Sequence, residues 1–235
     1  MRTLILVLIY VLLAISFTPL ILFCYLFKKP GPLMAVGRWA VSLGPNILGV
    51  KLEVRRSGEI DDRSPFIYMA NHLSFLDGPM LYMLIRRPLL VILKKSIFRI
   101  PIIGQGMRVV QFIPVDRRRG GGGKRSIDRA VRLMKEKNCS FLIFPEGTRS
   151  LDGRLQAFKR GGFILAAEAQ APIVPVAIDG TFEIMPKGRF FVRRGKVTVT
   201  FLPPVSVQGF VKENISDLAG KVRDVIQSQL GKVRP

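Results

Sequence analysis

An uncharged apolar run near the N-terminus constrains this chain more than any other feature. Leu4–Phe27 spans 24 residues without a charge, with Arg2 before it and Lys28 and Lys29 after it. As a helix rising about 1.5 Å per residue, the run is long enough to cross a hydrocarbon core of roughly 30 Å. A cleaved signal peptide is the alternative, with Ala14–Ser16 as a weak cleavage site, but the apolar run continues well past it. We therefore expect a retained N-terminal membrane-anchoring segment.

The sequence leaves the geometry of this segment open. Pro19 interrupts the apolar run, and Gly31-Pro32 ends it. A second apolar stretch follows over Leu33–Leu48, and it carries Trp39, a residue type that suits the membrane–water boundary. One arrangement is a helix that spans the bilayer. The other is two helices with a Pro/Gly joint that form a hairpin in one leaflet.

Composition narrows the class of protein. Hydrophobic residues make up 49% of the chain, which argues against disorder, and two cysteines are too few for a disulfide scaffold. Lys and Arg number 37 and Asp and Glu 16, so the net charge is +21. Nucleic acid, an anionic membrane surface, or an acidic protein or phosphorylated substrate would suit that charge. The anchor, and the lack of basic stretches interleaved with aromatic residues, argue against nucleic acid. Basic residues near the apolar segment favour a membrane-associated domain on the cytoplasmic face.

Beyond the anchor, stretches typical of strands alternate with stretches typical of helices. The expected strands are Val50–Arg56, Phe66–Ala70, Leu89–Leu93, Val109–Val115, Ser140–Phe144, Ile173–Ile178 and a hairpin of Phe190–Val192 with Val197–Phe201. The expected helices are Leu76–Ile85, one capped by Ser126, Phe163–Ala169 and Asn214–Leu230. This alternation predicts an α/β domain over residues 49–235, with a mixed, mostly parallel sheet flanked by helices. Residues 1–48 form the expected anchor.

The single histidine, His72, lies two residues after the expected strand Phe66–Ala70, and four residues separate it from Asp77. In α/β proteins, reactive side chains gather where strands end. Asp77 can accept a hydrogen bond from one imidazole nitrogen and leave the other free to take a proton. A purely structural histidine is the alternative, because Ser74-x-x-Asp77 also matches a helix capping box. Ser74 as a nucleophile is a further option, but no nucleophile elbow surrounds it.

A second candidate cluster, Phe144–Ser150, also follows an expected buried strand. Gly147 permits a tight turn, and the fork of donors on Arg149 suits a phosphate, helped by Thr148 and backbone N–H groups. Glu146 can anchor Arg149 or hold a substrate hydroxyl. A simple loop salt bridge is the alternative reading.

A third cluster lies at Phe112–Arg117, where Arg117 follows a strand-like stretch. It opens a basic, glycine-rich segment, Arg117–Arg125, that we expect to be a loop. The charges of Arg117–Arg119, Lys124 and Arg125 can dock an acidic partner, or they can simply be solvated.

Taken in order, these clusters resemble the lysophospholipid acyltransferase family, of the 1-acylglycerol-3-phosphate acyltransferase type. His72–Asp77 resembles its His-x4-Asp motif, and Phe112–Arg117 and Phe144–Ser150 resemble its second and third motifs. Phe158–Gly162 resembles the basic segment that often follows the third motif, and Val174–Ile178 resembles the fourth. Pro114 within the second motif departs from the pattern.

The resemblance implies a glycerolipid acyltransferase fold and acyl transfer from a thioester to the free hydroxyl of lysophosphatidate, which gives phosphatidate. It implies His72 as base and Asp77 as its partner. The implied acceptor-phosphate residues are Arg117, Glu146, Gly147, Thr148 and Arg149, with Lys159 as a possible addition. It implies no metal and no cofactor beyond an acyl-CoA or acyl-carrier-protein thioester as co-substrate. The implied partners are membrane lipids and an acidic carrier protein, with no nucleic acid. Two rivals stay open: an acyltransferase for another acceptor, and a non-catalytic membrane-binding protein.

Overall fold

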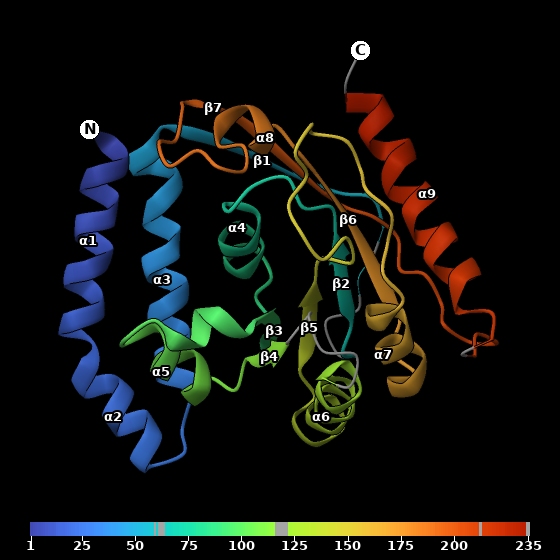
Figure 1. The fold of residues 1–235 in the computed structure, drawn as a ribbon, viewed down its shortest axis with the longest axis horizontal. Coiled ribbons are helices and arrows are strands. Elements are labelled where there is room, and N and C mark those ends of the chain that lie inside the picture. Colours follow the sequence, from blue (N-terminus) through green and yellow to red (C-terminus); the bar gives the residue numbers. More distant parts are fainter. Residues whose placement is uncertain (59, 61–63, 116–121, 212, 234–235) are drawn as a thin grey trace.

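A computed structural model describes residues 1–58, 60, 64–115, 122–211 and 213–233 (Figure 1). Helices and strands alternate from residue 50 onward, as the sequence predicts. The helices are α1 (Arg2–Ser16), α2 (Thr18–Leu26), α3 (Gly31–Leu48), α4 (Asp77–Leu84), the 3₁₀ helix η1 (Lys95–Arg99), α5 (Ile103–Val109), α6 (Gly122–Lys137), α7 (Gly161–Ala169), α8 (Thr181–Ile184) and α9 (Ile215–Val233). The strands are β1 (Val50–Arg56), β2 (Ile67–Ala70), β3 (Leu89–Lys94), β4 (Ile113–Val115), β5 (Ser140–Ile143), β6 (Ile173–Asp179) and β7 (Gly195–Phe201).

These strands form one seven-stranded sheet in the order β1-β7-β6-β2-β5-β3-β4. The neighbouring strands pair in parallel, apart from β6 and β7, which are antiparallel. β1 and β7 therefore run against the other five strands. This confirms the prediction of a mixed, mostly parallel sheet flanked by helices.

The core lies on both faces of the central strands. Every residue of β2 and β5 is buried, and so is nearly all of β6. Unbroken apolar runs of this kind are typical of parallel strands that are covered on both faces. Helices α6, α7 and α9 cover one face, and α3 and α4 lie on the other (Figure 1).

The N-terminal region folds as three helices, whereas the sequence indicated either one spanning helix or two helices in a hairpin. Phe17 separates α1 from α2, and Pro19 lies in the first turn of α2, where its missing N–H removes no helical hydrogen bond. α1 packs on α3, which continues into contacts with β1 and α4, and α2 contacts α5. Within the described part of the chain, none of the helices alone has the length and apolarity to cross a membrane. The pair α1 and α2, bent by 44°, meets that test together.

The prediction of a strand over Val109–Val115 is mostly wrong. Its first residue ends helix α5, and only Ile113–Val115 pair as a strand, at the edge of the sheet next to β3. Pro114 explains the short pairing, because proline has no N–H for a second neighbouring strand and is confined to sheet edges.

The expected N-cap at Ser126 is also wrong. α6 begins at Gly122, so Lys124 and Arg125 are helical, and the Ser126 hydroxyl donates to the Pro114 carbonyl at 3.1 Å. Arg117–Arg119 lie outside the described residues.

The expected hairpin of Phe190–Val192 with Val197–Phe201 does not form. Residues 190–192 are not a strand; the Val192 N–H donates to Thr3 Oγ1 at 3.0 Å and the Arg193 N–H to the Ile184 carbonyl at 3.0 Å. β7 instead lies between β1 and β6, so both of its edges are occupied by strands that are distant in sequence.

Candidate active site

Strand register brings the two principal sequence motifs together. β2 and β5 are parallel neighbours in which Met69 pairs with Ile143. His72 lies three residues after Met69, and Glu146 lies three residues after Ile143, so the two leave the sheet at the same level. The His72 backbone N–H donates to Glu146 Oε1 at 2.7 Å, and the Ser150 N–H donates to the His72 carbonyl at 2.8 Å. The two motifs therefore form one structural unit at the carboxyl ends of adjacent strands, where open α/β sheets place their sites.

His72 and Asp77 form a hydrogen-bonded pair. His72 Nδ1 lies 2.9 Å from Asp77 Oδ2, and the same oxygen accepts the N–H groups of Leu73 and Ser74, each at 2.7 Å. Asp77 is fully buried, while the His72 side chain keeps 20% of its surface exposed. Because a carboxylate only accepts hydrogen bonds, Nδ1 carries the proton and Nε2 is left with its lone pair.

Two further contacts hold the imidazole and its loop. The His72 ring stacks on Phe144, with ring centroids 4.1 Å apart and planes 20° apart. Asn71, fully buried, donates from Nδ2 to the Ile178 carbonyl at 2.8 Å and accepts the Ile178 N–H at 2.7 Å. The loop that carries His72 is thus tied to both strands that flank β2, and its orientation is set by the sheet.

Ser74 is part of this scaffold. Its hydroxyl is buried, donates to the Met185 carbonyl at 2.8 Å and accepts the Leu76 N–H at 3.2 Å. One of the two hydrogen bonds of the capping box forms, in which Asp77 accepts the Ser74 N–H. In place of the second bond, the Ser74 hydroxyl accepts the Leu76 N–H and not the Asp77 N–H. These contacts give Ser74 a structural role in the turn.

Glu146 is a buried carboxyl held by backbone groups. It is 2% exposed, and its oxygens accept the N–H groups of His72 and, at 3.3 Å, Gln156. Burial raises the pKa of Glu146 to about 7, although both of these hydrogen bonds act to lower it. Among the described residues, Glu146 makes no ion pair with Arg149; its carboxyl instead braces the His72 loop.

The turn after Glu146 gathers cationic groups. Gly147 has φ +74°, a left-handed conformation that favours glycine, and Lys159 packs over it so closely that an added Cβ would meet its Nζ at 3.0 Å. Lys187 Nζ donates to Thr148 Oγ1 at 3.1 Å. Arg149 is half-buried, and its guanidinium makes no hydrogen bond or ion pair within the described part of the chain.

The structure thus brings together most of the residues that the sequence marked. His72 and Asp77 form the pair above, and Glu146–Arg149 and Lys159 surround the adjoining turn. Arg117 lies outside the described residues. Sequence reasoning missed Asn71 and Lys187. An asparagine directly after an apolar strand and before the only histidine was a signal for Asn71, whereas Lys187 is 39 residues away from Thr148 and had no local signal.

The profile of the family described as Acyltransferase matches residues 51–179, a range that holds His72, Asp77 and the Glu146 turn. The chain belongs to this acyltransferase family. The resemblance stated from the motifs is thereby confirmed at the level of family.

Relatives and a solved structure agree with the acyltransferase assignment. The chain is 30% identical over 207 residues to a 1-acyl-sn-glycerol-3-phosphate acyltransferase of Haemophilus influenzae, covering 88% of this chain and 85% of that one. It is 35% identical over 179 residues to the enzyme of that name from Limnanthes douglasii, covering 76% of this chain and 63% of the plant protein. The crystal structure of the 1-acyl-sn-glycerophosphate acyltransferase PlsC from Thermotoga maritima superposes with a TM-score of 0.80 at 27% identity, covering 99% of this chain and 95% of that one.

Proposed function

We propose that this acyltransferase moves an acyl chain from a thioester to the free hydroxyl of 1-acylglycerol 3-phosphate, giving phosphatidate. The observation that carries the proposal is the His72–Asp77 pair, held at a strand end beside a turn rich in cations. The names of the relatives support the same acceptor. The chain spans 63% of the length of the two Limnanthes relatives.

In the proposed reaction His72 is the general base. Its Nε2 removes the proton from the acceptor hydroxyl as the oxygen attacks the thioester carbonyl. Asp77, bound to Nδ1, stabilises the imidazolium that forms. When the tetrahedral intermediate collapses, the C–S bond breaks and His72 returns the proton to the leaving thiolate. An ester and a free thiol are formed, and the enzyme is regenerated without a covalent intermediate.

We further propose that the turn after β5 binds the acceptor phosphate. Arg149 offers a planar fork of donors, Lys159 packs over Gly147, and Thr148 follows Gly147 in the chain. Glu146 contributes by bracing the turn against the His72 loop, so that phosphate and base keep a fixed separation. By family resemblance Arg117 joins this set.

The proposed acceptor is a lipid, and α1 and α2 offer a surface for it. Exposed apolar side chains on these helices are Leu4, Ile5, Val7, Leu8, Val11, Leu12, Ile15, Leu22, Phe23, Tyr25, Leu26 and Phe27. An apolar face of this extent is typical of a membrane or protein contact. Because α1 packs on α3 and α2 contacts α5, we propose that the pair lies against one leaflet with the catalytic domain, on the cytoplasmic side of the membrane.

Acyl-CoA and acyl carrier protein are both proposed donors. The basic charges of Lys124 and Arg125 in α6 would suit an acidic carrier protein. The second candidate function is the acylation of another lysophospholipid, for which the same base and thioester chemistry would serve.

A product assay tests the proposal. Full-length protein in lipid receives lysophosphatidate and labelled acyl-CoA or acyl carrier protein, in parallel with His72→Ala and with Phe75→Ala. Phe75 lies in the same loop but is 61% exposed, which makes it a matched control. We expect phosphatidate from the wild type and the control, and none from His72→Ala. Product from His72→Ala at the wild-type rate would refute the mechanism, and product only with another lysolipid would refute the acceptor.

A further inference from the structure

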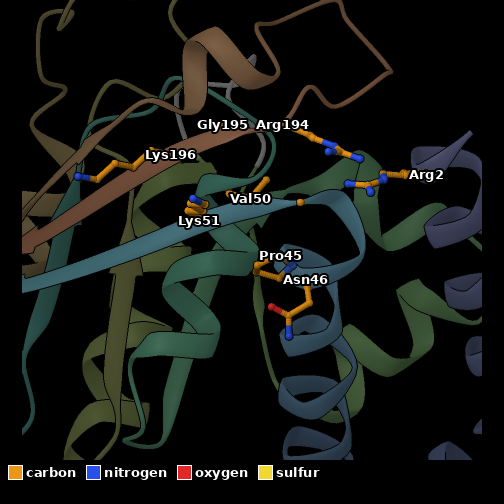
Figure 2. Close-up of a pocket in the computed structure, with 9 residues that line it drawn as sticks. Arg2, Pro45, Asn46, Val50, Lys51, Arg194, Gly195 and Lys196 are labelled. Atoms are coloured by element: carbon orange, nitrogen blue, oxygen red, sulfur yellow. The ribbon is translucent and has the colours of Figure 1, made fainter.

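A second cationic site lies apart from the catalytic pair. An open pocket of about 600 Å³ is formed where the start of α1, the end of α3 and the starts of β1 and β7 meet (Figure 2). The pocket is lined by Arg2, Pro45, Asn46, Gly49, Val50, Lys51, Arg194, Gly195 and Lys196. None of these residues belongs to the candidate active site.

The positive charge of this pocket exceeds the negative charge around it. Lys196 pairs with Glu53 at 2.5 Å, and Glu53 also accepts from Arg55 at 2.6 Å. Arg2, Lys51 and Arg194 make no ion pair with any carboxylate in the described ranges. Figure 2 shows the guanidinium groups of Arg2 and Arg194 close to one another at the mouth of the pocket. Three cations that line one pocket, and that have no carboxylate partner among the described residues, form a site for an anion.

Gly49 brings the two arginines together. It ends α3 with φ +73°, and a Cβ at this position would lie 2.5 Å from Arg2 Nη1 and 3.2 Å from Arg194 Cγ. Both side chains therefore pack over the bare glycine backbone. Two guanidinium groups repel each other at short range, and an anion bound between them removes that repulsion.

The surroundings of the pocket favour a lipid as the source of the anion. Leu4 and Ile5 of α1 are exposed beside Arg2, and Phe190 and Phe191 are exposed on the segment that leads to Arg194. The hydrogen bond from the Val192 N–H to Thr3 Oγ1 holds that segment against α1. Exposed apolar residues therefore lie close in sequence to both arginines, in the two segments that meet at the pocket. A phospholipid presents the same arrangement, a charged phosphate next to apolar chains.

We propose that this pocket binds the phosphate of an anionic membrane phospholipid, at a site separate from the acceptor phosphate of the reaction. Arg2 and Arg194 bind the phosphate oxygens, and Lys51 adds charge. The bound lipid fixes the N-terminal end of α1 and the segment before β7 at the membrane surface. This inference rests on the proposed membrane contact of α1 and α2, but it does not depend on acyl transfer.

Vesicle flotation of the full-length protein tests the site. The vesicles are phosphatidylcholine alone, or phosphatidylcholine with one lipid in five replaced by phosphatidate. The test variants are Arg194→Glu and Arg2→Gln. Arg193→Glu is the matched control, since Arg193 is an exposed neighbour with the same charge that does not line the pocket. Thermal unfolding of each variant shows whether the fold is intact.

We expect Arg194→Glu to weaken the partition onto phosphatidate vesicles about tenfold more than Arg193→Glu does, because direct charge-assisted hydrogen bonds are lost in addition to general attraction. Binding to phosphatidylcholine vesicles should be equal for the two variants. Equal effects of both on phosphatidate vesicles would overturn the site. If inorganic phosphate stabilises the wild type against thermal unfolding more than it stabilises Arg194→Glu, while Arg194→Glu and Arg193→Glu bind phosphatidate vesicles equally, the occupant is free phosphate and the lipid is overturned. Failure of the wild type to bind either vesicle would refute the membrane contact itself.

Discussion

His72 Nδ1 lies 2.9 Å from Asp77 Oδ2, and that one oxygen also accepts the backbone N–H groups of Leu73 and Ser74. A single atom of Asp77 thus orients the imidazole and closes the turn that carries it. Catalytic geometry and local folding depend on the same buried group, so substitutions of Asp77 can separate the two roles.

Asp77→Asn should abolish most activity and preserve the fold. The amide oxygen can still accept the turn N–H groups, but it lacks the charge that stabilises an imidazolium. We expect kcat to fall by about 10²- to 10⁴-fold. Asp77→Ala should also lower stability, because it leaves buried N–H groups without partners, at about 1–3 kcal/mol each. Steady-state kinetics and thermal unfolding of both variants check this. Unchanged kcat in Asp77→Asn would contradict it.

Arg149 should affect the KM for the acceptor lipid and not the KM for the acyl donor. Arg149→Ala removes the donor fork proposed for the phosphate, so the KM for lysophosphatidate should rise about 10- to 100-fold. Arg149→Lys should recover part of this loss, because a point charge lacks the fork. The KM for the acyl thioester serves as the internal control. A rise in that constant instead would assign Arg149 to the donor.

Glu146 should make stability depend on pH. Its folded pKa of about 7 lies above the ordinary value of 4.5. Between these values the folded chain keeps a proton that the unfolded chain has released, so the free energy of unfolding falls as pH rises. The fall should begin near pH 4.5, be complete above about pH 7 and amount to about 3 kcal/mol.

Glu146→Gln isolates this effect, because glutamine does not titrate. Urea unfolding of both proteins across that pH window gives the difference between their stabilities. The difference should shift in favour of Glu146→Gln as pH rises. Parallel curves would mean that the carboxyl titrates alike in the folded and unfolded chains.

Replacing Asn71 by alanine should lower the free energy of unfolding more than replacing a surface asparagine does. Asn71→Ala leaves the Ile178 N–H and C=O groups buried without their partners, so the expected cost is about 2–4 kcal/mol. Asn46→Ala, at an exposed position, should change stability by less than about 0.5 kcal/mol. Chemical denaturation measures both, and equal effects would show that the bonds between Asn71 and Ile178 contribute little.

Much of this architecture could be predicted from local pattern. The strand at Val50–Arg56 has the predicted bounds, and apolar runs located β2, β5 and β6. The strand predictions were wrong where pairing depends on segments that are distant in the sequence. Phe190–Val192 has strand-forming residues, but β7 already pairs with β6 along one edge and with β1 along the other. Propensity cannot anticipate such an outcome, because strand pairing depends on the whole sheet.

In the candidate site, too, local sequence predicted some features, and contacts between distant residues decided the others. The order of residues by itself determined that His72 and Asp77 lie within reach of each other, since only the four residues 73–76 separate them. It also marked Glu146–Arg149 as a turn, because Gly147 favours a left-handed backbone. Only the tertiary structure decided that Glu146 binds the backbone of His72, that Asn71 binds Ile178 and that Arg2 meets Arg194 over Gly49. Those contacts join residues far apart in the chain, and they exist only because the register of β2 with its neighbours and the packing of α3 onto β1 bring them together.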